Sequence, residues 1–148
     1  MSLQEWHNNG WIRKHTTSSQ EIKNLIEIIS RDIRDAESNE LSPDWRFGIA
    51  YNAALKLCTI LIYSKGFRPE RNLAHYRTIQ SMPLILGNHK KVDANYLDAC
   101  RSRRNTLEYD YAGGTTNADA DELIRFVKDL ETEVINWLNN NYPDLLKL

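Results

Sequence analysis

The sequence predicts an all-α fold, an up-and-down bundle of four long helices plus a short or broken helix. Three observations lead to this prediction. Apolar residues recur every three or four positions along several stretches, capping residues bound these stretches, and no segment shows the alternating pattern of a strand. A chain of 148 residues can bury its own core, so we expect an N-terminal arm over residues 1–18 and a single helical domain over residues 19–148.

The composition is that of an ordinary soluble globular protein, with 41% hydrophobic and 26% charged residues. No run approaches the roughly 18 consecutive apolar residues of a membrane span, and no signal peptide precedes the helices. We therefore expect a cytoplasmic protein with no membrane partner. Cys58 and Cys100 fall on apolar helical faces and are expected to be reduced core thiols.

The N-terminal arm contains Trp6 and Trp11 but no sustained apolar period, which predicts an ordered arm or a short helix whose tryptophans pack on the bundle. The first long helix should begin after Ser18, because Ser18 and Glu21 have the spacing of a capping box, and it should end near Ala36. The second helix should begin with Ser42 as its cap and Pro43 in its first turn, and end at Gly66. Its apolar content predicts the core helix.

The third helix is expected over residues 73–86, with a kink or restart after Met82 because Pro83 removes a backbone donor. Asp93 is expected to cap a fourth helix, which ends at Gly113–Gly114. The last helix should begin within residues 115–119 and end at Pro143. Its apolar stripe is formed by Leu123, Phe126, Val127, Leu130, Val134, Trp137 and Leu138.

The net charge of −1 hides an uneven distribution. Residues 65–104 contain nine cations and three acids, a net charge of +6, so the remainder of the chain carries −7. A basic middle flanked by acidic ends indicates either a phosphate-binding face or attraction to the acidic part of a second copy. A solvated surface without a ligand is the alternative.

The strongest functional signal is an arginine on an apolar helical face. At about 100° per residue, Arg104 shares one face of the fourth helix with Leu97, Cys100, Leu107 and Tyr111. A guanidinium keeps its proton, so burying it requires a carboxylate, carbonyl groups or a bound anion. Glu108, one turn later, is a structural partner for Arg104; the functional alternative is a phosphate bound beside Asn105 and the tyrosines.

The run Arg104-Asn105, three further residues and then Tyr109-Asp110-Tyr111 resembles the signature of HEPN domains, small helical bundles of prokaryotic toxin systems and RNA-processing proteins. Their motif is an arginine, often followed by asparagine, with a histidine after four to six intervening residues. Some members carry a tyrosine two places after that histidine, which a partner nucleotidyltransferase can modify with AMP. Arg104, Asn105 and Tyr111 match this pattern, and Tyr109 stands where the histidine should be.

Residues 50–56 and 63–69 also resemble the second helix and following turn of HEPN domains. The resemblance covers about residues 19–140 and implies the same bundle, a homodimer with a shared cleft, and RNA, a nucleotide or a nucleotidyltransferase as partner. We favour a binding module of a toxin–antitoxin, stress or defence system whose active site is degenerate. A purely structural bundle is the third reading.

The alternative is a metal-independent endoribonuclease with Arg104, Asn105 and Tyr109 as candidate catalytic residues. A tyrosine, with an unperturbed pKa near 10, replaces a histidine poorly as acid or base, so His75 or His89 would have to supply the imidazole. We expect no metal and no cofactor, since the sequence has no Glu-x-x-His pair, Walker loop, dinucleotide-binding glycine pattern or zinc spacing. The candidate binding residues are Arg101, Arg103, Tyr111, His75, Lys90 and Lys91.

Overall fold

A computed structural model describes residues 1–109 and 113–147, with the side chains of residues 106–109 outside that description. It is mostly helical, which confirms the all-α prediction. The elements in chain order are α1 (Leu3–Asn8), β1 (Ile12–Lys14), α2 (Ser19–Ala36), α3 (Pro43–Ser64), β2 (Phe67–Pro69), α4 (Ala74–Gln80), α5 (Met82–Leu86), η1 (Asn88–Lys90), α6 (Lys91–Tyr109), α7 (Asn117–Asn141) and η2 (Pro143–Leu146).

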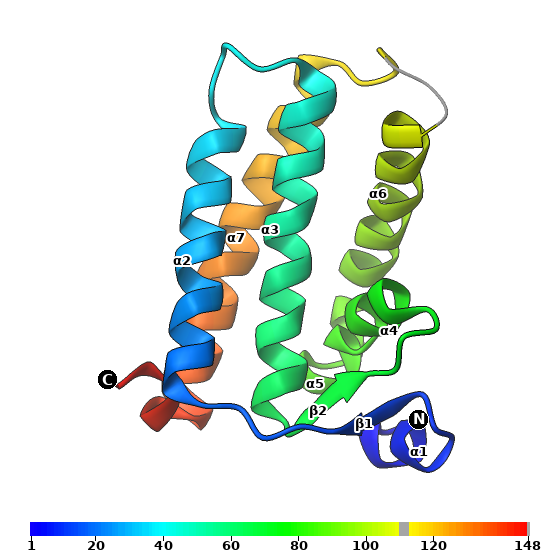
Figure 1. The fold of residues 1–148 in the computed structure, drawn as a ribbon, viewed down its shortest axis with the longest axis vertical. Coiled ribbons are helices and arrows are strands. Elements are labelled where there is room, and N and C mark those ends of the chain that lie inside the picture. Colours follow the sequence, from blue (N-terminus) through cyan, green and yellow to red (C-terminus); the bar gives the residue numbers. More distant parts are fainter. Residues whose placement is uncertain (110–112, 148) are drawn as a thin grey trace.

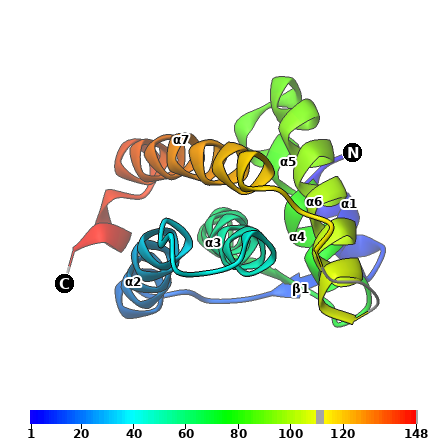
Figure 2. The same cartoon turned by 90° about the horizontal axis from the view of Figure 1, so that it is seen from above.

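Helix α3 lies at the centre of the fold. It packs against α2, α6 and α7, and the view from above shows it between α2, α7 and the α4–α6 side of the molecule (Figure 2). In Figure 1, α2 and α6 run upward whereas α3 and α7 run downward. The large side chains of α3 that are fully buried are Tyr51, Leu57, Ile60, Leu61 and Ile62.

Helix α3 is also long and apolar enough, by length and composition, to cross a membrane. Within the fold, however, 72% of its most apolar 18-residue window is buried against other parts of the chain. A central helix of a globular core has the same composition, and the burial of α3 accounts for its apolar character here.

The N-terminal arm forms helix α1 and a short strand. Ser2 caps α1, and β1 pairs with β2 in an antiparallel ladder that places Ile12 opposite Pro69 and Lys14 opposite Phe67. The prediction that the chain has no strand is therefore wrong. Each strand has three residues, which is too short for an alternating pattern to be visible in the sequence. The arm brings Trp6 against its own small apolar cluster with Leu3, Ile12 and Ile62.

Most helix boundaries follow the predicted caps. The hydroxyl groups of Ser18, Ser42 and Thr116 each accept a hydrogen bond from the backbone of the first turn of α2, α3 and α7, respectively. Gly66, with φ +88°, follows the end of α3 in the left-handed region that glycine favours.

Two boundaries differ from the prediction. The third predicted helix is interrupted at Ser81, before Met82 rather than after it, and Pro83 lies in the first turn of α5. Proline needs no donor there, so it begins a new helix instead of kinking an old one. Asp93 does not cap the fourth helix, because α6 begins at Lys91, and the Asp93 carboxylate instead pairs with Lys90 at 2.7 Å.

Candidate phosphate-binding site

A cluster of cationic side chains lies where α3, α4 and α6 meet. Arg101 and Arg104 are three residues apart on α6 and so project from neighbouring positions on one face. His75 lies in the first turn of α4, and Lys56 lies on α3. Helices α3, α4 and α6 pack against one another, and the pKa of His75 is lowered by burial and then by the charges of Arg104, Lys56 and Arg101. We call Arg101, Arg104, His75 and Lys56 the cationic cluster.

The ring of Tyr51 lies against the guanidinium of Arg104. The guanidinium carbon of Arg104 lies 5.6 Å from the centre of the Tyr51 ring, within the range of a cation–π contact. The tyrosine is fully buried, and no described residue hydrogen-bonds to its hydroxyl. Burial raises the pKa of Tyr51 above its usual value, against the opposing effect of Arg101 and Arg104. The hydroxyl is therefore a neutral donor beside two cations.

Among the described residues, Arg101 pairs with a single carboxylate. Its Nε donates to Oδ1 of Asp98 at 2.8 Å, and both side chains are about a quarter exposed. Arginine has five N–H donors, so this bond leaves four on the terminal nitrogens of Arg101 for further contacts.

Arg103, a predicted binding residue, lies away from the cluster. It donates to the carbonyl of Gly114 and to Oδ2 of Asp119, both at 2.8 Å, and its guanidinium carbon lies 5.3 Å from the ring of Phe47. Hydrogen bonds to Thr116, followed by that from Arg103, lower the pKa of Asp119. Arg103 thus connects α6 to the beginning of α7, and its neighbour Asn105 is exposed to solvent.

The lysines predicted to bind lie at the far end of α6. The Lys90 ammonium is only 11% exposed and pairs with Asp93 at 2.7 Å and Glu133 at 2.6 Å. Burial lowers the pKa of Lys90, but its hydrogen bonds to these two carboxylates outweigh that effect and raise it. Lys91 is exposed and faces a separate pocket, so the predicted binding residues do not form one surface.

Several predicted contacts lie outside the described residues. These are the Arg104–Glu108 pairing, the side chain of Tyr109 and all of Tyr111. The backbone of Tyr109 ends α6. The positions that correspond to the motif histidine and the modifiable tyrosine therefore stay predictions.

Both cysteines are free and buried, as predicted. Burial raises the pKa of the Cys58 thiol to about 12 and that of the Cys100 thiol to about 11. Because the thiolate is the nucleophile and the metal ligand, both groups are chemically inert at neutral pH.

Sequence reasoning missed three residues of this region. Tyr51 and Lys56 stand in the apolar middle of a helix. A buried phenol and a cation there each need a polar partner, and that need was a usable signal. Arg77 was counted only as part of the basic middle. Its neighbours, Trp6 and Trp11, are more than sixty positions away, and no local pattern indicates that contact.

Within the described residues, no group of three or more His, Cys, Asp and Glu side chains is arranged to hold a metal ion. The chemistry that the cationic cluster offers is electrostatic, a set of fixed donors suited to an oxyanion. No protein-family model matches the chain, and comparison with curated proteins and with solved structures found no similar one.

Proposed function

We propose that this chain is a HEPN-like protein, built as an up-and-down bundle of four long helices, that binds RNA or a nucleotide through a phosphate at the cationic cluster. Arg101 and Arg104 contact the phosphate oxygens, and His75 adds a further donor. The proposal places the protein in the cytoplasm, as a homodimer in a toxin–antitoxin, stress or defence module with a nucleotidyltransferase partner.

The observation that carries the proposal is the convergence of cations from three helices. Like charges brought together in a partly buried region repel one another, and the pKa of His75 is lowered first by burial and then by the charges of Arg104, Lys56 and Arg101. A bound phosphate relieves it. Arginine forks match phosphate oxygens in a bidentate geometry, and such charge-assisted hydrogen bonds are about twice as strong as neutral ones.

A second function, metal-independent RNA cleavage, is favoured by the position of His75. A neutral imidazole accepts the proton of an attacking 2′-hydroxyl, and the lowered pKa of His75 keeps it neutral at physiological pH. Arg104, close enough to influence that pKa, stabilises the charge that develops on the scissile phosphate. In this reading His75 takes the role that Tyr109 fills poorly.

Binding is tested by fluorescence anisotropy with labelled single-stranded RNA and with a labelled mononucleotide. Arg104→Gln should weaken affinity for the single-stranded RNA at least tenfold, whereas Arg34→Gln, an exposed arginine near the end of α2, should change it less than twofold. The logarithm of the binding constant should fall linearly with the logarithm of salt concentration, less steeply in the Arg104 variant. Equal effects of the two substitutions, with both proteins folded, would refute the phosphate site.

A cleavage assay with a chelator present distinguishes RNA binding from metal-independent RNA cleavage. A binding module leaves RNA intact. An endoribonuclease produces fragments that disappear in His75→Asn and in Arg104→Gln but persist in His89→Asn, since His89 is an exposed residue of η1 at the other end of α6.

A further inference from the structure

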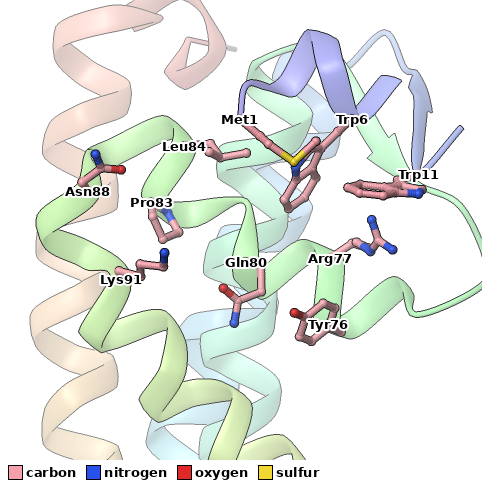
Figure 3. Close-up of a pocket in the computed structure, with 10 residues that line it drawn as sticks. All are labelled: Met1, Trp6, Trp11, Tyr76, Arg77, Gln80, Pro83, Leu84, Asn88 and Lys91. Atoms are coloured by element: carbon pink, nitrogen blue, oxygen red, sulfur yellow. The ribbon is translucent and has the colours of Figure 1, made fainter. Parts of the chain in front are cut away.

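A pocket of about 390 Å³ lies on the other side of α4, beneath the N-terminal arm (Figure 3). Trp6 and Trp11 enter it from the arm, Tyr76, Arg77 and Gln80 from α4, and Lys91 from the start of α6. Its volume lies in the range of roughly 300 to 1,000 Å³ found for small-molecule sites. None of these side chains belongs to the cationic cluster.

Arg77 is held in this pocket by aromatic rings. Its guanidinium carbon lies 3.9 Å from the centre of the Trp11 ring and 5.8 Å from that of Trp6, and the two indoles themselves meet edge to face at 6.1 Å. This stacking fixes the plane of the guanidinium. One face of the cation is therefore covered by an indole, and its donors are already positioned.

The charge of Arg77 has no acidic counterpart in the described residues. No ion pair joins it to a carboxylate there, and its buried Nε has no hydrogen-bond partner. The pocket lining contains no aspartate or glutamate, and Lys91 adds a second positive charge. A partly buried guanidinium without a carboxylate partner is stabilised by an anion within reach of its terminal nitrogens.

The remaining side chains of the lining select among anions. Tyr76 leaves 36% of its surface exposed and offers an aromatic ring at the pocket, and Gln80 offers an amide that both donates and accepts hydrogen bonds. Aromatic rings and guanidinium planes stack on nucleobases, and amides pair with base edges. A simple inorganic anion or an acidic side chain would contact only Arg77 and Lys91 and would leave Tyr76 and Gln80 without a partner.

We propose that this pocket binds one nucleotide unit, with its base packed against Tyr76 and the plane of Arg77 and its phosphate held by Arg77 and Lys91. The site stands on a different set of side chains from the cationic cluster. Lys91 and Arg101 lie on the same helix, about 15 Å apart along its axis. A short RNA strand spans both sites, whereas a mononucleotide fills one.

Tryptophan fluorescence reports on this pocket directly, since two of the four tryptophans line it. The background variant carries Trp45→Phe and Trp137→Phe, which leaves Trp6 and Trp11 as the only indoles. AMP or UMP should change its emission saturably, and the corresponding nucleosides and inorganic phosphate should bind at least tenfold more weakly. No saturable change, or equal binding of phosphate alone, overturns the proposal.

Substitutions then test the individual contacts in that background. Arg77→Gln and Lys91→Gln should each weaken mononucleotide binding at least fivefold. Because Arg77 also packs on the indoles, substituting it changes the pocket as well as removing a contact. The exposed ring of Tyr76 therefore provides a second test: Tyr76→Ala should weaken the binding of AMP without affecting the binding of inorganic phosphate. Arg71→Gln, an exposed arginine before α4, is the matched control and should leave binding unchanged. Stronger binding of an acidic peptide than of a mononucleotide also overturns the proposal.

A trinucleotide distinguishes this site from the cationic cluster. If both sites bind, the trinucleotide binds more tightly than the mononucleotide, and Arg101→Gln removes that gain but not mononucleotide binding. If only the cluster binds, Arg101→Gln weakens trinucleotide binding while Arg77→Gln and Tyr76→Ala leave it unchanged, and the pocket proposal fails alone.

Discussion

The guanidinium carbon of Arg104 lies 5.6 Å from the centre of the Tyr51 ring. Tyr51 belongs to the central helix α3, and its side chain is fully buried. The contact connects the face of α6 that carries the motif arginine to the core. It explains how an apolar helical face accommodates a cation, since the electron-rich face of the phenol ring offsets part of the cost of removing a guanidinium from water.

The Tyr51→Phe substitution removes the hydroxyl and keeps the aromatic ring, so it measures the contribution of the hydroxyl alone. Since no described residue hydrogen-bonds to that hydroxyl, its removal should leave the free energy of unfolding unchanged or raise it by up to about 1 kcal/mol. Tyr51→Leu also removes the aromatic ring and should lower it by roughly 2 to 4 kcal/mol. Urea denaturation of both variants provides the measurement, and a loss above about 1 kcal/mol in Tyr51→Phe would contradict the assignment.

The lowered pKa of His75 predicts a pH dependence with a definite sign. Between the folded-state pKa and the unfolded value near 6.5, the unfolded chain binds more protons, so this residue lowers stability as the pH falls through that interval. Wild type should therefore lose more stability than His75→Asn when the pH falls from about 7 to about 5. His75 is exposed, and solvent screening keeps the effect small.

A phosphate bound at the cationic cluster should oppose the lowering of the His75 pKa. An anion favours the protonated imidazole, so the pKa of His75 should rise on addition of a mononucleotide, and NMR titration of the imidazole measures this directly. Arg104→Gln should raise the pKa of His75 in the absence of ligand, because one positive neighbour is lost. An unchanged pKa in that variant would show that the two side chains do not interact.

Arg46 connects the beginning of α3 to the end of α2 and to the beginning of α7. It is buried and donates to the carbonyl of Ala36 at 2.8 Å, to Asn117 at 3.0 Å and to Asp121 at 2.6 Å. Asp121→Ala should lower the free energy of unfolding by roughly 1 to 3 kcal/mol, because it leaves a buried charge without its carboxylate. The exposed Asp129 on the same helix is the control, and Asp129→Ala should change stability by less than about 0.5 kcal/mol.

Dimerisation is the prediction that follows from the HEPN resemblance and from the charge distribution. Residues 65–104 carry +6 and the rest of the chain −7, so two copies can place basic and acidic faces against each other. Sedimentation equilibrium should show a dimer that dissociates as the salt concentration rises. A monomer at all concentrations and salt levels would refute it and would remove the shared cleft from the proposed function.

The sequence alone determined the features that depend on residues a few positions apart. The caps at Ser18 and Ser42 and the left-handed glycine after α3 follow from contacts within one turn, which act wherever the segment folds. The same locality placed Arg104 on the helix face that carries Leu97 and Cys100, both of which are buried. The cap prediction failed at Asp93, because α6 follows η1 directly and begins at Lys91, three residues before the predicted start at Ala94.

Tertiary structure decided everything that joins distant segments. His75 approaches the arginines of α6, Trp11 stacks on Arg77, and β1 pairs with β2, although more than twenty residues separate the partners in each case. Such contacts form because burying the apolar faces of α3, α4 and α6 brings their polar neighbours along, and burial is non-directional and carries no local signature. The sequence predicts that the tryptophans of the arm pack on the bundle, but only the tertiary structure shows that they pack on Arg77.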